Sequence, residues 1–284
     1  MNWFTETMAS DPHRWPQQTL SIGDEKLAFI RTGGRSAAVL LIHGNSSCKE
    51  VFVHQISFLA RLGYDVVAPD LPGHGDSANA ADPARVYSFP GYATTLQSLM
   101  QEIKIEAYHV VGWSLGGHIG IEMWAVHDAV RSLLITGTPP VRLSAAGAAE
   151  GFLPSSAMDL AGKAEFSEND VVAYGSAMLG DVIDPSSPLA RCIARTHGDA
   201  RRLMLENGLA GLGRDQVAAV ESCPKPLAIV QGRNDPFVNL AHIERLTYRN
   251  LWLHNPLIVN GGHAPHWMHA EDFNRHLGAF IEVN

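Results

Sequence analysis

The sequence predicts an α/β fold built around a mostly parallel β-sheet flanked by helices. Short apolar runs recur along the chain, and each is followed by a turn and then by a segment of helical character. Most runs are continuously apolar rather than alternating, as expected for parallel strands that are covered on both faces. Strand–helix alternation of this kind implies right-handed β-α-β units. Strands are expected at 26–32, 37–44, 64–70, 107–113, 131–137, 226–232 and 255–261, and helices at 51–62, 91–104, 115–128, 239–247 and 270–282.

This alternation is interrupted between Pro139 and Pro224. The intervening stretch is rich in Ala, Gly and Met and contains no convincing strand, so we expect a helical insertion over 140–223. The core is then expected to comprise 1–139 and 224–284. Ligands of open α/β sheets bind beyond the carboxyl ends of the strands, so the insertion is expected to form a cap that encloses the binding site.

Composition argues against several classes of partner. Of the 284 residues, 46% are hydrophobic and 18% charged, which is typical of a globular protein. The net charge is −8 without a basic cluster, which disfavours nucleic acid and anionic membranes as partners. No apolar run approaches the length of a membrane span, and the N-terminal segment lacks the pattern of a signal peptide. We therefore expect neither nucleic acid nor a membrane as a partner.

The cysteine content indicates the compartment. Cys48, Cys192 and Cys223 are odd in number and include no C-x-x-C pair. That pattern is unlike a disulfide framework and fits a reducing environment. The sequence therefore predicts a cytoplasmic protein, and it carries no indication of oligomeric state.

One glycine-rich segment suggests a nucleophile. Gly112-Trp113-Ser114-Leu115-Gly116 matches the pattern G-x-S-x-G, with a predicted strand before it and a predicted helix after it. Such a tight turn would hold Ser114 in strained, positive-φ backbone and would leave no room for side chains two residues to either side. The alternative is that any junction of strand, turn and helix collects glycine and serine by chance.

A serine hydroxyl becomes a good nucleophile only when a base takes its proton. Asp235 follows the strand expected at 226–232, and His263 follows the strand expected at 255–261. The order serine, aspartate, histidine along the chain is the order expected on such a sheet. We therefore predict Ser114 as nucleophile, His263 as base and Asp235 as the acid that orients the base.

Two other positions are weaker candidates for the acid. Asn234 cannot carry the negative charge that stabilises an imidazolium, although it lies directly before Asp235. Asp70 lies in "DLPGHGDS", whose proline and glycine spacing indicates a structural loop.

Acyl transfer also needs N–H donors for the developing oxyanion. Leu115 directly follows Ser114 at a helix start, and its N–H is the first predicted donor. The segment "LLIHGNSS" supplies the second, because Gly44 lets the backbone turn inward so that the N–H of Asn45 can point at the oxyanion. The alternative is that His43-Gly44 is merely a turn.

The remaining candidates concern metal and substrate. His263, His266 and His269 recur at intervals of three, but no carboxylate or cysteine pattern of a zinc hydrolase accompanies them. We therefore predict no metal and no cofactor, and expect His266 and His269 to be ordinary surface or helix-start residues.

Tyr174 is expected on a helix of the insertion among apolar residues, where core packing is the commoner role. It could equally lie over Ser114 and donate a hydrogen bond to substrate. Gly44 and Trp113 are also predicted to contribute to substrate binding, since they flank the predicted nucleophile and oxyanion donor.

Six stretches carry a family resemblance: "LIHGNSS", "VVAPDLPGHGDS", "GWSLGGHIGIEMW", "ITGTPPV", "GRNDPFV" and "NGGHAP". With them the chain resembles the α/β-hydrolases over nearly its whole length, and more narrowly the α/β-hydrolase type of N-acyl-homoserine lactone lactonases. The resemblance implies Ser114 as nucleophile, His263 as base, Asp235 as acid, Asn45 at the oxyanion position and Tyr174 as a cap tyrosine that contacts substrate. Glutamate is also seen at the acid position of such enzymes, and the segment after "GGHAP" follows the pattern poorly.

The implied function is that of a metal-independent serine hydrolase. It would open the lactone ring of N-acyl homoserine lactones, which are quorum-sensing signals, through a Ser-His-Asp triad and an acyl-enzyme. A general carboxylesterase acting on small acyclic esters is the first alternative, and a non-catalytic ligand-binding α/β-hydrolase is the second. A dehalogenase or epoxide hydrolase would need an aspartate in place of Ser114.

Overall fold

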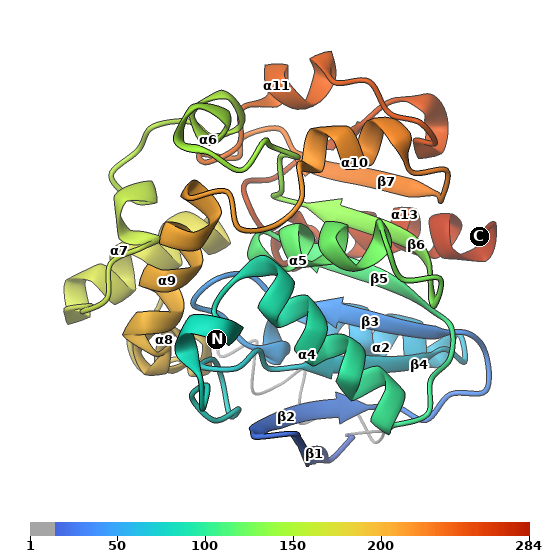
Figure 1. Ribbon diagram of the computed structural model, residues 1–284, viewed down its shortest axis with the longest axis horizontal. Helices are drawn as coiled ribbons and strands as arrows, with labels where there is room; N and C mark the ends of the chain where they lie inside the picture. The colour runs from blue at the N-terminus through green and yellow to red at the C-terminus, as the bar shows by residue number, and fades with distance from the viewer. Residues whose placement is uncertain (1–14) are drawn as a thin grey trace.

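The computed structural model describes residues 15–284, which form an eight-stranded sheet in the order β1-β2-β4-β3-β5-β6-β7-β8 (Figure 1). The N-terminal segment 1–14, on which the signal-peptide prediction falls, lies outside the described residues. The strands are β1 (Gln17–Ile22), β2 (Glu25–Arg31), β3 (Ala38–Ile42), β4 (Asp65–Pro69), β5 (Tyr108–Trp113), β6 (Val130–Thr136), β7 (Leu227–Gly232) and β8 (Leu257–Val259).

The seven expected strands are confirmed, and the sheet is parallel from β4 to β8. The prediction missed β1, which pairs antiparallel with β2 at the edge of the sheet. Its sequence, QQTLSI, is largely polar and mostly exposed, so it lacks the continuous apolar run by which the other strands were recognised. A turn at Gly23, with φ of 57°, joins the two strands into a hairpin.

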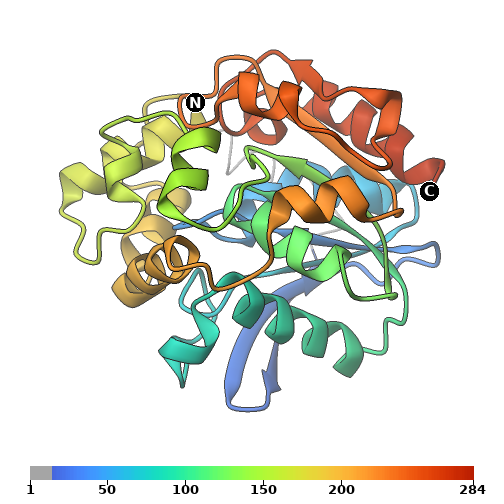
Figure 2. The ribbon, with the colours of Figure 1, turned by 45° about the horizontal axis from the view of Figure 1, so that its top comes forward.

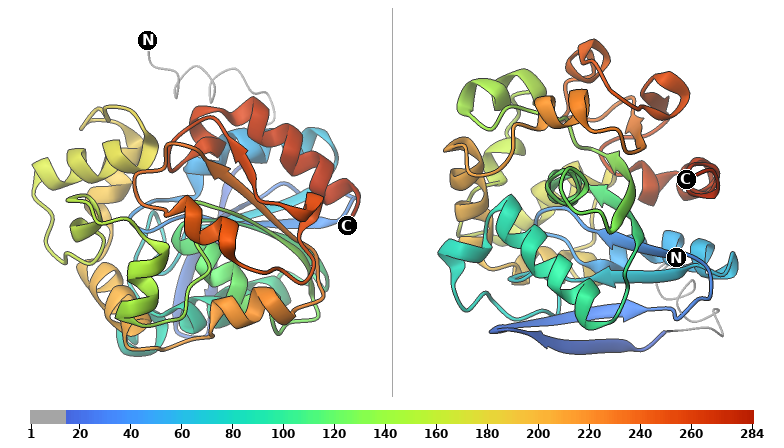
Figure 3. Two further views of the ribbon diagram at one scale, coloured as in Figure 1. Left: turned by 90° about the horizontal axis from the view of Figure 1, so that it is seen from above. Right: turned by 45° about the vertical axis from the view of Figure 1, so that its right-hand side comes forward.

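Helices cover both faces of the parallel strands, as the continuous apolar runs predicted. Helices α4 (Phe89–Glu102), α5 (Leu115–Trp124) and α10 (Gln216–Ser222) lie on one face, and α2 (Val53–Arg61) and α13 (Ala270–Glu282) lie on the other (Figure 3). Strand β3 shows the arrangement residue by residue. Leu40 and Ile42 join the apolar cluster of the first face, whereas Val39 and Leu41 join that of the second. The mean exposure of β3 is therefore near zero.

The remaining helices lie in the segments that connect the strands or follow the last strand. They are α3 (Pro83–Val86), α6 (Ala145–Gly151), α7 (Glu168–Leu179), α8 (Pro188–Arg195), α9 (Gly198–Leu209), α11 (Leu240–Arg245) and α12 (Pro265–Met268), with short 3-10 turns η1 (Lys49–Phe52), η2 (Met158–Leu160) and η3 (Trp252–His254). Over residues 15–284, no helix is long and apolar enough to cross a membrane.

The segment 140–223 is helical and free of strands within the sheet. Its helices α6 to α9 gather at the end of the sheet where the parallel strands finish (Figures 1 and 2). Helix α10 lies instead beside β7 and packs against α5. We propose that α6 to α9 form the cap and that α10 belongs to the core.

A buried ion cluster supports the loop after β3. Lys49, only 1% exposed, places its ammonium 2.8 Å from Asp70 Oδ2, 2.9 Å from Asp76 Oδ2 and 2.9 Å from Glu50 Oε1. Asp70 is fully buried, and its Oδ1 also accepts a hydrogen bond from the Lys49 backbone N–H at 2.7 Å. Burial alone would lower the pKa of Lys49, but Asp70 and Glu50 outweigh it and raise the pKa. These contacts give Asp70 the structural role that the sequence predicted.

Replacing Lys49 by methionine is expected to lower the free energy of unfolding by about 3–5 kcal/mol, because the Asp70 carboxylate would remain buried without its counter-ion. Chemical denaturation monitored by circular dichroism measures this. The control is Arg202→Met, since Arg202 makes only exposed ion pairs with Asp199 and Glu206 and its removal should leave stability nearly unchanged. Equal stabilities of the two variants would contradict the prediction.

Candidate active site

The turn between β5 and α5 has the strained geometry predicted for it. Ser114 has φ of 54° and ψ of −119°, outside the helix that begins at Leu115. A Cβ at Gly116 would lie 2.0 Å from the carbonyl oxygen of Ile42, and one at Gly112 would lie 2.4 Å from the carbonyl oxygen of Gly116. No side chain fits at either position. The glycines are therefore required by the close approach of the chain to itself.

The predicted base and acid are in contact. His263 Nδ1 lies 2.8 Å from Asp235 Oδ2, and both residues are buried, at 2% and 6% exposure. Asp235 lies in the loop after β7, and His263 in the loop after β8. The other ring nitrogen, His263 Nε2, has no hydrogen-bond partner among the described residues. It is therefore available to take a proton from a hydroxyl or a water.

Asp235 is held as a carboxylate. Its Oδ1 accepts hydrogen bonds from the backbone N–H groups of Phe237 and Val238 at 2.8 and 3.2 Å, and its Oδ2 accepts one from Gln231 Nε2 at 2.7 Å. Burial alone would raise the pKa of Asp235, but the adjacent His263 and these donors hold it below its usual value. The carboxylate can therefore stabilise a positive charge on His263 at neutral pH.

Ser114 and His263 both adjoin the segment 136–138 at the end of β6. The Ser114 N–H donates to Thr136 O at 2.9 Å, and Thr138 Oγ1 donates to Ser114 O at 2.9 Å. A Cβ at Gly137, between them, would lie 2.9 Å from His263 Cε1. The structure thus brings the predicted nucleophile, base and acid to one region at the carboxyl ends of β5 to β8.

The loop after β3 passes directly over the predicted nucleophile. A Cβ at Gly44 would lie 3.0 Å from Trp113 Cε3 and 3.2 Å from Ser114 Cβ, closer than ordinary side-chain contacts, so glycine favours this approach of the backbone. Asn45 follows and is 4% exposed. Leu115 is the first residue of α5, where the N–H has no acceptor within the helix. A helix start also favours negative charge, as on an oxyanion.

Two predicted site residues, Asn45 and Tyr174, meet across the boundary between loop and cap. Asn45 Nδ2 donates to Ala161 O at 2.8 Å and to the Tyr174 hydroxyl at 3.3 Å. Burial raises the pKa of Tyr174 to about 12, although Asn45 and Arg201 oppose the shift. The tyrosine hydroxyl therefore keeps its proton at neutral pH and can donate a hydrogen bond.

Trp113 and His266 support the loop that carries His263. Trp113 is 1% exposed, and its Nε1 donates to the carbonyl oxygen of His263 at 2.9 Å. Its ring also lies 4.9 Å from that of His266. His266 is at a helix start, one of the two places expected for it; it is fully buried, and burial holds its pKa well below the usual value.

Sequence reasoning missed Gln231. Its side chain is fully buried, and Oε1 accepts from Gly137 N–H at 3.0 Å while Nε2 donates to Asp235. It therefore links the segment beside Ser114 to the acid. The available signal was a lone polar residue in the otherwise apolar strand LAIVQG.

Among the described residues, the regularly spaced His263, His266 and His269 do not form a group that could hold a metal ion. Within residues 15–284, the one group of His, Cys, Asp and Glu side chains close enough to hold an ion comprises Cys48, Glu50 and Cys192.

Comparison with known proteins adds a family and a close structural relative. A model of the alpha/beta hydrolase family matches residues 39–276. Two mutants of the N-acyl homoserine lactonase AidH, one complexed with N-hexanoyl homoserine lactone and one with N-hexanoyl homoserine, are each 39% identical to the chain. Their structures match this one with TM-scores of 0.88 and 0.90. The matches cover 94% and 95% of this chain and 97% of each AidH chain.

Curated relatives are more distant in sequence. The dihydrolipoyllysine-residue acetyltransferase component of the acetoin cleaving system of Cupriavidus necator is 29% identical over 89% of this chain and 67% of its own. The pimeloyl-(acyl-carrier protein) methyl ester esterase of Aromatoleum aromaticum is 28% identical over 82% of this chain and 94% of its own. The family match spans the strands and loops that position Ser114, Asp235 and His263, and the chain belongs to the alpha/beta hydrolase family.

Proposed function

We propose that the protein is a serine hydrolase that opens the lactone ring of N-acyl homoserine lactones. The observation that carries the reaction class is the buried contact between His263 and Asp235 beside the strained turn at Ser114. The likeness to AidH, a lactonase by name and 39% identical over nearly the whole chain, supports the substrate class.

In the first half of the reaction, Ser114 Oγ attacks the ring carbonyl while His263 Nε2 takes the hydroxyl proton. The oxyanion that forms is stabilised by the N–H groups of Asn45 and Leu115. Asp235 fixes the tautomer of His263 and stabilises its positive charge. Collapse of the tetrahedral intermediate breaks the ring C–O bond, and His263 returns the proton to the departing alkoxide.

In the second half, water deprotonated by His263 attacks the acyl-enzyme and releases the hydroxy acid. A lactone poses a particular problem here, because the alcohol just formed stays tethered to the acyl group. Intramolecular attack has effective molarities on the order of 10⁵ M or more, so ring closure competes with hydrolysis. We infer that the Tyr174 hydroxyl, on the cap beside Asn45, binds the freed hydroxyl and turns it away.

Ser114→Ala is expected to lower turnover of N-hexanoyl homoserine lactone by about 10⁴-fold or more. The protein is first treated with a chelator. Mass spectrometry then quantifies the ring-opened product, which is heavier than the lactone by one water. Ser222→Ala is the control, since Ser222 is an exposed serine at the end of α10. Turnover that survives in Ser114→Ala, or that chelation abolishes in the wild type, would contradict the proposal.

Tyr174→Phe is expected to lower lactone turnover about 2- to 10-fold more than turnover of an untethered aryl ester, the worth of one hydrogen bond. Steady-state rates on the two substrates measure the difference. Tyr248→Phe is the matched control, because Tyr248 is a tyrosine whose hydroxyl binds Ile243 O away from the site. Equal losses on both substrates would remove the proposed role of Tyr174.

Gln231→Leu is expected to lower kcat by about 10-fold, since it removes one charge-assisted hydrogen bond from Asp235. That hydrogen bond favours the carboxylate, so its loss raises the pKa of Asp235 and activity is lost at a higher pH on acidification. The pH profile of kcat distinguishes this from misfolding, which would reduce activity equally at every pH. An unmoved acid limb would contradict the positioning role of Gln231.

A general carboxylesterase is the second candidate, favoured by the 28% identity to the pimeloyl-(acyl-carrier protein) methyl ester esterase. It uses the same residues, but it predicts rapid cleavage of short aryl esters and no cleavage of N-acyl homoserine lactones. Parallel assays on both substrate types decide between the candidates.

A further inference from the structure

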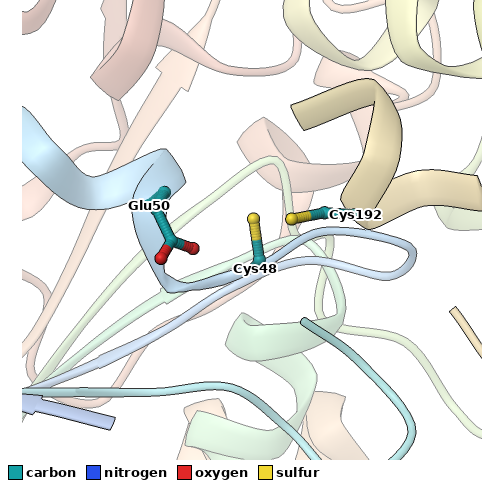
Figure 4. Close-up of side chains that lie close together, drawn as sticks. All are labelled: Cys48, Glu50 and Cys192. Atoms are coloured by element: carbon teal, nitrogen blue, oxygen red, sulfur yellow. The ribbon is translucent and has the colours of Figure 1, made fainter. Parts of the chain in front are cut away.

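Two of the three cysteines meet where the cap faces the loop after β3. Cys48 lies directly before η1 and is fully buried, whereas Cys192 lies on α8 of the cap and is half-buried. Figure 4 shows the two sulfur atoms facing each other, with the carboxylate of Glu50 on the other side of Cys48. The two Sγ atoms and a carboxylate oxygen of Glu50 all lie within 4.8 Å of one another.

We propose that Cys48, Cys192 and Glu50 form a binding site for a thiophilic divalent cation such as Zn²⁺, with water as the fourth ligand. Two thiolates and a carboxylate are ligands that Zn²⁺ accepts, and tetrahedral bonds of about 2.3 Å to sulfur and 2.0 Å to oxygen separate the ligand atoms by roughly 3.5–3.8 Å. The three side chains therefore need to approach one another by little more than about 1 Å. Small side-chain rotations of Cys192 and Glu50, which are less buried than Cys48, supply that movement.

The charges around the site are compatible with a bound cation. Lys49 is surrounded by the carboxylates of Glu50, Asp70 and Asp76, and the buried Arg201 guanidinium lies 3.4 Å from Ile193 O, the residue after Cys192. Three carboxylates against these two cations leave negative charge in excess. If Glu50 turns to the metal, Lys49 keeps Asp70 at 2.8 Å and Asp76 at 2.9 Å. A dication that replaces the two thiol protons would therefore leave the net charge of the site unchanged and no buried ammonium unpaired.

The same environment disfavours a disulfide. Burial and the neighbouring Cys192, Glu50 and Asp70 raise the pKa of the Cys48 thiol, so the thiolate that attacks in oxidation is scarce. A dication reverses this balance, because each coordinating thiol releases its proton to solvent and the thiolate is stabilised by the metal.

The site would join the cap to the core. Cys192 lies on α8, and Cys48 is three residues after Asn45 in the loop that passes over Ser114. Metal binding would fix the distance between α8 and this loop, which already contacts other parts of the cap through the hydrogen bonds of Asn45 to Ala161 and Tyr174. The site stands apart from the proposed hydrolase reaction and does not depend on it.

Cobalt titration of the chelator-stripped, fully reduced protein tests the proposal, because thiolate-to-cobalt charge transfer absorbs in the near ultraviolet and histidine ligation does not. This distinction is needed in a chain with 14 histidines. We expect one equivalent of Co²⁺ to produce the absorption and excess Zn²⁺ to abolish it. Zn²⁺ at 100-fold over its Kd should also raise Tm by about 5 °C.

Variants assign the absorption to these ligands. Cys48→Ser and Cys192→Ser should each abolish the one-equivalent band, Glu50→Gln should weaken cobalt binding at least about 10-fold, and Cys223→Ser should change nothing. Cys192 is half-buried on the cap, so its variant is expected to fold normally by circular dichroism even if Cys48→Ser does not. No band in the reduced wild type, or a band that persists in Cys192→Ser, overturns the proposal. If the band is absent and air oxidation links Cys48 to Cys192, the pair is a redox crosslink instead.

Discussion

The close approach of the turn after β5 to the end of β3 is the constraint on which the rest of the site depends. The backbone at Gly116 lies so near the carbonyl oxygen of Ile42 that a Cβ there would stand 2.0 Å from it. This contact fixes Ser114 at φ of 54° and begins α5 at the next residue. It also brings the loop at Gly44 within van der Waals reach of the serine. One backbone contact thus places the proposed nucleophile beside both proposed oxyanion donors.

The loop after β3 connects this constraint to the cap. Asn45 binds cap residues through its side chain, and Lys49 anchors the same loop to the buried Asp70. The cap is therefore tied to the loop that passes over Ser114, rather than resting on the sheet by apolar contacts alone. If the cap moves, the hydrogen bonds from Asn45 to Ala161 and Tyr174 either break or pull the loop along with the cap. We infer that cap position and oxyanion geometry are coupled.

Much of this architecture could be predicted from the sequence because local rules govern it. Continuous apolar runs identify buried parallel strands, and a polar residue directly after such a strand, as at Asp235 and His263, lies at the carboxyl edge of the sheet. Edge strand β1 was not predicted, because its exposed, polar sequence carries no such signal. The role of Gln231 and the proximity of Cys48 to Cys192 could not be predicted, because each depends on which side chains, distant in sequence, the fold brings together.

We propose that Ser114 is a nucleophile activated by His263. Labelling with a fluorophosphonate, followed by peptide mass spectrometry, tests it most directly, because the reagent modifies only a serine whose proton an adjacent base removes. We expect a single adduct at Ser114 that forms slowly in His263→Ala and is delayed by N-hexanoyl homoserine lactone in the wild type. An unlabelled protein, or an adduct at another serine, would contradict it.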